Sequence, residues 1–122
     1  MMDAVATADV VITNPTHFAV ALKYETRRGA PRVVAKGVDQ IALAIRARAE
    51  AHRVSMVEAP PLARALYHTT RLDQEIPPAL YLAVAQVLAY VYRLRAARAD
   101  GNPAPETPRD LPVPPGLDPK NT

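Results

Sequence analysis

The sequence of 122 residues contains no cysteine and no tryptophan, only one phenylalanine and only four glycines. Without cysteine the chain can form neither disulfides nor thiolate metal sites, which favours an intracellular location. Because aromatic side chains are so few, the core must be built from Val, Leu, Ile and Ala. So few glycines leave little material for a phosphate-binding loop, and no serine-centred nucleophile motif is present.

Long apolar runs are also missing. No run approaches the roughly 18–20 residues that span a bilayer, and the start does not resemble a signal peptide. The net charge of +3 is typical of a solvated surface, and no aromatic residues are interleaved with the arginines for stacking on bases, so we expect no nucleic-acid partner. His17, His52 and His68 lie far apart without Cys companions, so we expect neither a metal nor a cofactor.

Four short segments have the composition of β-strands. Residues 9–13 contain the continuous apolar run Val10, Val11 and Ile12, which predicts an internal strand covered on both faces. Residues 18–24 alternate with a period of two, which predicts a strand with one more exposed side. Residues 33–35 predict a third strand that ends at Gly37, and residues 54–58 predict a fourth.

Three helices are predicted from apolar residues at helical spacing. The helix over 38–53 is amphipathic, with Arg on its outer face and an inner face formed by Val38, Ile41, Ala42, Ile45 and Ala49. The helix over 61–70 begins at a Pro pair and offers to the core Leu62, Ala65, Leu66 and Thr69. The helix over about 78–98 is apolar nearly all round, so it is either buried or meets a partner.

These elements predict an α/β fold: a single compact domain with a roughly four-stranded mixed sheet surrounded by about three to four helices. Residues 1–8 are predicted to be the end of a linker helix, and residues 9–98 the domain itself. Seven of the 13 prolines lie in 103–122, which predicts a disordered, Pro-rich tail over 99–122 with no periodicity to bury. Within it, residues 111–115 (LPVPP) are either a short recognition motif or inert.

The stretch Asn14-Pro15-Thr16-His17 lies between the first two predicted strands. Asn is favoured at the first position of a β-turn and Pro at the second. The sequence therefore predicts a turn closed by a hydrogen bond from the His17 N–H to the Asn14 carbonyl. Taken alone, an Asn-Pro pair of this kind can be an inert turn.

The same four residues also allow a backbone cleavage. Because Pro15 has no N–H, its nitrogen cannot attack the Asn14 side chain. The Asn14 carboxamide nitrogen can instead attack its own backbone carbonyl, close a succinimide and expel Pro15 as an amine. The turn hydrogen bond would polarise that carbonyl, and an imidazole such as that of His17 can supply a proton near neutral pH.

The run over residues 8–24, which contains this turn, resembles the cytoplasmic domain of the FlhB/YscU family, the specificity-switch proteins of flagellar and type III secretion export. Residues 30–37, 61–67 and 75–77 are similar to the same family, in order and at its spacing, so the resemblance covers roughly residues 4–95. Three segments resemble the flagellar branch more than the injectisome branch, namely 33–37, 85–92 and 111–115.

This resemblance implies a single self-cleavage between Asn14 and Pro15, at a catalytic site completed by Thr16 and His17, and not a protease acting on other substrates. It also implies control of a switch from hook and rod to filament export substrates. The implied partners are export substrates, a hook-length regulator, other export apparatus proteins and the membrane segment of a longer protein. The implied location is the cytoplasmic face of the bacterial inner membrane, with this chain alone soluble.

Two further surfaces are predicted. Ala30 and Pro31 place apolar side chains in a loop, and Ala85 and Leu88 share a helical face, so the four form a candidate substrate-binding patch unless Ala85 and Leu88 belong to the core. Lys36 either contacts an acidic partner or ends its strand in solvent. The competing hypothesis for the whole chain is a small basic binding module with an inert Asn-Pro turn.

Overall fold

The computed structural model describes residues 1–15 and 17–119. Thr16, predicted as part of the catalytic turn, and tail residues 120–122 lie outside the described residues. In chain order the elements are α1 (Met2–Val5), β1 (Val10–Asn14), β2 (Phe18–Lys23), η1 (Thr26–Arg28), β3 (Arg32–Val38), α2 (Asp39–Ala51), β4 (Met56–Glu58), α3 (Pro60–Thr69), η2 (Pro78–Leu80), α4 (Tyr81–Asp100) and η3 (Pro115–Leu117).

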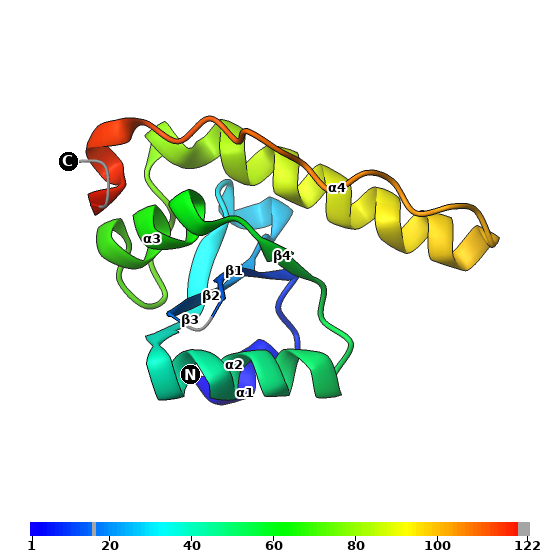
Figure 1. The fold of residues 1–122 in the computed structure, drawn as a ribbon, viewed down its shortest axis with the longest axis horizontal. Coiled ribbons are helices and arrows are strands. Elements are labelled where there is room, and N and C mark those ends of the chain that lie inside the picture. Colours follow the sequence, from blue (N-terminus) through cyan, green and yellow to red (C-terminus); the bar gives the residue numbers. More distant parts are fainter. Residues whose placement is uncertain (16, 120–122) are drawn as a thin grey trace.

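The four strands form one mixed sheet in the order β3-β2-β1-β4 (Figure 1). β1 pairs antiparallel with β2 and parallel with β4, while β2 pairs antiparallel with β3. The tight β1–β2 hairpin holds the Asn-Pro turn, whereas the parallel pairing of β1 with β4 needs the longer connection through β3 and α2. The predicted four-stranded mixed sheet and the internal position of the first strand are confirmed.

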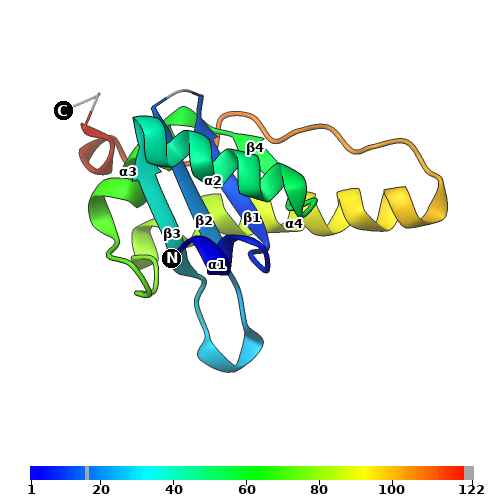
Figure 2. The same cartoon turned by 90° about the horizontal axis from the view of Figure 1, so that it is seen from below.

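Helices cover both faces of this sheet (Figures 1 and 2): α2 and the short α1 lie on one face, α3 and α4 on the other. Alternate residues of β2 enter the two cores, and Ala19 and Ala21 are fully buried on the α2 side. The prediction that this strand has one more exposed side is therefore wrong. Alanine faces a helix as readily as a solvated surface, so alternation with Ala does not distinguish the two.

Gly37 does not end β3 but lies inside it, opposite Ala19. A Cβ at this position would collide with Ile41 in the first turn of α2, so glycine permits the close approach of strand and helix. Ile41 was predicted to be in the core, but its side chain is 49% exposed and covers Gly37. That correction follows from the sharp entry of the chain into α2, where Asp39 has a φ of +49°.

Other details of the helices and strands also differ from the predictions. Helix α2 ends at Ala51, and residues 52–53 form a turn in which Arg53 has a φ of +57°. Strand β4 begins at Met56 rather than at residue 54. Thr69 was predicted to face the core but is exposed at the end of α3, where its hydroxyl donates to the Ala65 carbonyl at 2.7 Å.

The predicted helix over 78–98 is the 3-10 turn η2 followed by α4. One face of α4 is buried on the sheet through Ala83, Val84, Val87, Leu88, Val91 and Leu94. Its outer surface leaves Tyr81, Leu82 and Tyr92 exposed. The first alternative, burial, therefore holds for one face of α4. The other face presents apolar side chains to solvent, and contact with a partner stays a prediction. In the described part of the chain, no helix is long and apolar enough to cross a membrane.

The tail returns over the domain. Gly101, with a φ of +71°, ends α4, and the chain then runs back along α4 towards α3 (Figure 1). Leu111, Val113 and Leu117 pack against the core between α3, α4 and the sheet. The tail has no hydrophobic periodicity, as predicted, yet these three side chains contact the core, which composition alone does not reveal.

Candidate functional site

The Asn-Pro turn joins the two central strands. Asn14 is the last residue of β1 and faces Phe18, the first residue of β2. The His17 N–H donates to the Asn14 carbonyl with an N to O distance of 3.0 Å, which confirms the predicted turn hydrogen bond. Asn14 and Pro15 are half-buried, whereas His17 is exposed. The carbonyl next to the Asn14–Pro15 bond thus already accepts a hydrogen bond.

Both flanks of the turn are fixed by neighbouring backbone. The Thr13 carbonyl accepts from the Ala59 N–H at 2.9 Å, just before α3, and the His17 carbonyl accepts from the Asp39 N–H at 3.0 Å, at the start of α2. His17 Nδ1 also lies 3.8 Å from an Asp39 carboxylate oxygen, but both side chains are largely exposed, so this pair contributes little. The hairpin tip is therefore positioned mainly by main-chain hydrogen bonds.

A group of rings supports the β2 side of the turn. The Phe18 ring packs against Tyr67 and His68 of α3, with centroid distances of 5.2 and 5.7 Å. Lys36 Nζ donates to the Tyr67 carbonyl at 2.8 Å and lies 4.8 Å from the Tyr67 ring centroid. Burial lowers the pKa of Lys36. Lys36 therefore contacts its own chain from inside β3, so the prediction that it ends the strand in solvent is wrong, while contact with an acidic partner stays a prediction.

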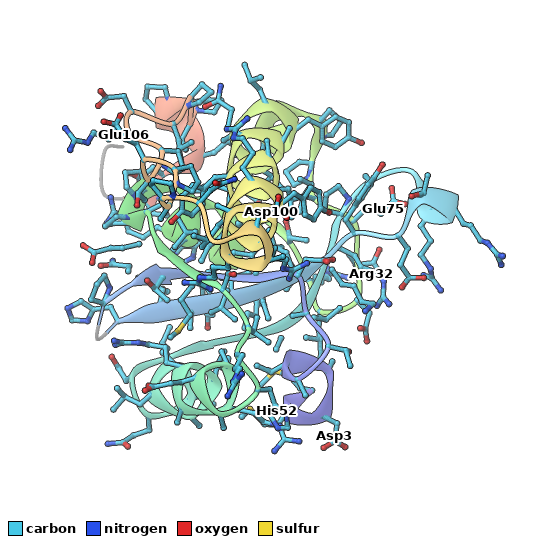
Figure 3. The ribbon with its side chains drawn as sticks, turned by 90° about the vertical axis from the view of Figure 1, so that its right-hand side faces the viewer. Asp3, Arg32, His52, Glu75, Asp100 and Glu106 are labelled. Carbon is cyan, nitrogen blue, oxygen red and sulfur yellow. The ribbon has the colours of Figure 1, made fainter. Side chains whose placement is uncertain are left out.

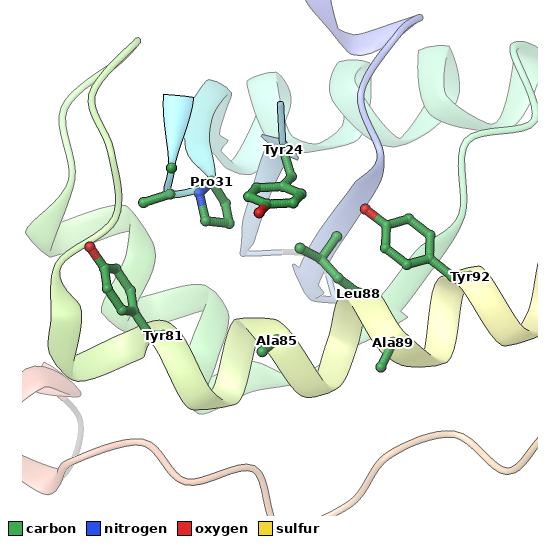
Figure 4. A pocket seen from close by; sticks show the side chains of 9 residues that line it. Tyr24, Pro31, Tyr81, Ala85, Leu88, Ala89 and Tyr92 are labelled. Carbon is green, nitrogen blue, oxygen red and sulfur yellow. The ribbon is translucent and has the colours of Figure 1, made fainter. Parts of the chain in front are cut away.

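A second site brings together the four residues of the predicted docking patch. Ala30, Pro31, Ala85 and Leu88 line one pocket of about 360 Å³ between the 24–31 loop and α4 (Figure 4). Ala85 is exposed on α4, whereas Leu88 is only 6% exposed and belongs to the core as well. The remaining lining residues are Tyr24, Gly29, Tyr81, Ala89 and Tyr92.

Sequence reasoning missed the three tyrosines of this pocket. Tyr81 and Tyr92 stand one turn before Ala85 and one turn after Leu88 on α4, so helical spacing alone could have added them to the patch. Tyr24 comes from the end of β2, and no local pattern connects it to α4. Burial, and to a lesser extent the nearby Asp9 carboxylate, raise the pKa of Tyr92, which keeps this hydroxyl neutral.

Hydrogen bonds and ion pairs hold the pocket walls in place. The Tyr24 N–H donates to the Asp9 carboxylate at 2.7 Å, and Arg95 of α4 donates to the Asp9 carbonyl at 3.0 Å, so Asp9 joins the two walls. At the base of the loop, Arg32 pairs with Glu25 at 3.0 Å and lies 3.6 Å from Asp73. Figure 3 shows Arg32 below Glu75 at this end of the sheet.

The turn and the pocket lie at opposite ends of β2. The turn precedes Phe18 and the pocket begins at Tyr24, so the two sites are separate and are linked by the central strand (Figure 2). Among residues 1–15 and 17–119, no group of three or more His, Cys, Asp or Glu side chains could hold a metal ion.

This combination of fold and turn has relatives among known proteins. Residues 1–91 match the model of the FlhB, HrpN, YscU and SpaS family. The chain belongs to this family. It is 53% identical over 119 residues to the flagellar biosynthetic protein FlhB of Yersinia enterocolitica and 54% identical over 119 residues to that of Salmonella typhimurium. Each comparison covers 97% of this chain but 31% of the relative, so the chain spans about a third of their length.

Solved structures of the family have the same architecture. The crystal structure of the cytoplasmic domain of FlhB from Shewanella putrefaciens superposes with a TM-score of 0.89 at 50% identity, covering 96% of this chain and 92% of that one. A substituted EscU C-terminal domain superposes with a TM-score of 0.71 at 31% identity, covering 74% of this chain and 91% of that one. The mixed sheet with its helices is therefore the fold of an FlhB cytoplasmic domain, as the resemblance predicted.

Proposed function

We propose that this domain cuts its own backbone once, between Asn14 and Pro15, and that the cut serves substrate control in a type III export apparatus. The observation that carries the proposal is the 3.0 Å hydrogen bond from the His17 N–H to the Asn14 carbonyl, at the tip of a hairpin fixed on both flanks. This donor faces the oxygen that gains negative charge when the Asn14 carbonyl is attacked.

The Asn14 side chain supplies the nucleophile. Its carboxamide nitrogen attacks the backbone carbonyl carbon of Asn14, and the new C–N bond closes a five-membered succinimide. The bond to Pro15 then breaks. The proton that the carboxamide nitrogen loses is balanced by one that the Pro15 nitrogen gains, and His17 is the proposed donor because it carries an imidazole two residues after Pro15, in the same turn. The chemistry runs once, since the nucleophile is consumed.

The relatives support a role in export. The similar full-length proteins are named for flagellar biosynthesis, and solved EscU domains carry substitutions at an asparagine and at the proline that directly follows it, the same pair of residue types as Asn14 and Pro15. We infer that residues 1–8 lead from a membrane segment to this domain at the cytoplasmic face of the inner membrane. There, with other export proteins, cleavage permits the switch from hook and rod substrates to filament substrates.

The pocket at the far end of β2 is the proposed docking site for export substrates or a hook-length regulator. Its walls are mostly apolar and its volume of about 360 Å³ lies at the lower end of the range for ligand pockets, which suits one or two apolar side chains of a peptide. The tyrosine hydroxyls at its edge would supply the polar contacts that fix the orientation of such a peptide.

Charged substitutions in α4 test this docking site. Ala85→Asp changes an exposed pocket residue, so we expect it to weaken binding of a hook-type export substrate in calorimetry and to leave the melting temperature nearly unchanged. Leu82→Asp, on the same helix and 61% exposed but outside the pocket lining, is the matched control. Leu88→Asp should unfold the domain, because Leu88 is 6% exposed. Unchanged binding by Ala85→Asp would refute docking here.

Mass spectrometry under denaturing conditions tests the cleavage. The parent chain should give two pieces, Asn14→Ala and Asn14→Asp should stay intact because the carboxamide nitrogen is missing, and Pro15→Ala should be slower. The rate should rise with pH, since the amide attacks more readily as its proton is removed. If the parent chain stays intact over days, the turn is inert, and the alternative of a small basic binding module takes the place of this proposal.

A further inference from the structure

We propose that residues 111–118 form a strap that docks on its own domain, is fastened by an ion pair between Arg64 and Asp118, and can detach when that pair is broken. The strap crosses α3 and the first turns of α4, on the opposite side of the sheet from α2 (Figure 1). Neither the turn chemistry nor the pocket uses this segment. The proposal therefore stands independently of the proposed function.

The strap has an inner and an outer side. Leu111 and Val113 are half-buried and pack against the core, whereas Pro112, Pro114 and Pro115 are exposed. This alternation is that of an extended chain with one face bound. The segment predicted as either a recognition motif or inert is thus bound to its own domain, with its apolar side chains turned inward.

The fastening is an ion pair with two hydrogen bonds. Arg64 Nε and Nη2 donate to the two Asp118 carboxylate oxygens at 2.7 and 2.9 Å. The Asp118 side chain is 1% exposed and the Arg64 side chain 13%. Loss of the Asp118 carboxylate would remove a bidentate counter-ion from the largely buried Arg64 guanidinium, which is far more costly than loss of an exposed pair.

Two main-chain hydrogen bonds of the strap are local. The Leu117 and Asp118 N–H groups donate to the Pro114 and Pro115 carbonyls, so these two main-chain bonds stay within the strap. The prolines have no N–H to offer to the domain. The half-buried apolar side chains and the Arg64–Asp118 ion pair oppose the entropy gained on release. Removal of this ion pair should therefore shift the equilibrium towards the detached strap.

The surface beneath the tail shares residues with the docking pocket. Ala85 and Ala89 line the pocket on one side, and with Pro108 and Arg109 they also line a cleft beneath the tail on the other side. Detachment of the strap should therefore change the surroundings of these two alanines. The regulatory consequence, an altered affinity of the pocket for peptides, rests on the proposed docking function, whereas the strap itself does not.

Two spin labels on the full chain measure detachment. Because the chain has no cysteine, Ala44→Cys and Gly116→Cys provide unique label sites. Ala44 is exposed on α2, and a side chain at position 116 meets no atom within 4 Å. Pulsed electron resonance should give one narrow distance distribution for the labelled parent. Asp118→Asn should add a broad, long component by raising the detached population roughly tenfold or more. Asp110→Asn, the same charge change at an exposed position of the tail, is the control and should stay narrow.

Amide chemical shifts of the unlabelled protein test the link to the pocket. In Asp118→Asn the Ala85 and Ala89 amide signals should move, while the signals of α2 stay in place. A broad distance distribution in the labelled parent would overturn the docked strap. A narrow distribution in Asp118→Asn would overturn the role of the ion pair in fastening it. A detached strap with unmoved Ala85 and Ala89 signals would overturn the link to the pocket.

Discussion

After cleavage, residues 1–14 should remain bound, because they contain β1, one of the two central strands of the sheet. β1 lies between β2 and β4, so the cut at its end frees no edge of the sheet. Val5, Val10, Val11 and Ile12 are fully buried. At about 1.5–3 kcal/mol for each buried side chain, their exposure on release would cost roughly 6–12 kcal/mol, before the main-chain hydrogen bonds to both neighbouring strands are counted.

Ile12→Ala weakens this retention in a calculable way. Truncation of a buried Ile costs about 2–5 kcal/mol, which corresponds to roughly 30- to 5,000-fold weaker binding of the short piece. Met56→Ala is the matched control, because Met56 lies on the adjacent strand β4 opposite Val11 but is 40% exposed. We therefore expect a shorter residence time for the Ile12→Ala fragment than for the parent or control.

The assay compares native and denaturing separation of the same sample. For the parent, native size exclusion should give one species where denaturing electrophoresis gives two, and native mass spectrometry should give the summed mass. Ile12→Ala should lose the short piece on dilution. If the two parent pieces elute separately under native conditions, burial of the β1 side chains is too weak to retain the 1–14 piece, and the inference from an internal β1 is refuted.

Two other predictions concern stability and are checked by urea denaturation. Gly37→Ala should lower the free energy of unfolding by about 1–3 kcal/mol, because the new Cβ collides with Ile41. Adding Ile41→Ala should restore part of this lost stability. A urea midpoint unchanged by Gly37→Ala would contradict the close approach of β3 and α2. The hydrogen bond from Arg32 lowers the pKa of Glu25 below 4.5, so this contribution to stability is complete above about pH 4.5 and is lost as the pH falls through the lowered pKa. Glu25→Gln should therefore destabilise the protein more near neutral pH than in acid. An equal loss of stability at both pH values would count against a stabilising role of ionised Glu25.

The sequence predicted the elements whose patterns are local. The apolar run before Asn14, the Asn-Pro turn and the Pro-started helices each carry their signal within a few residues, and the mixed sheet and the turn hydrogen bond were confirmed. The faces of β2 were wrong because Ala19 and Ala21 fit a helix contact as well as a solvated surface. Ile41 was misplaced because the chain enters α2 through a left-handed Asp39.

Apart from the patch of Ala30, Pro31, Ala85 and Leu88, contacts between distant segments were not predicted. Tyr24 meets α4 in the pocket through the packing of the whole sheet, and Lys36 meets Tyr67 across β3 and α3. Arg64 and Asp118 are 54 positions apart, and nothing around either residue indicates an ion pair. Composition predicted a disordered, Pro-rich tail and gave no sign that three of its apolar side chains pack against the core.

The new C-terminus formed at Asn14 tests the central claim most directly. A rapidly quenched sample of the parent chain, analysed by mass spectrometry, should contain a 1–14 piece one water lighter than its acid form. That species should decay into both asparagine and isoasparagine ends, together with a free Pro15 amine on the partner piece. A 1–14 piece that carries only ordinary asparagine at every time point, or cleavage that persists in Asn14→Ala, would contradict cyclisation.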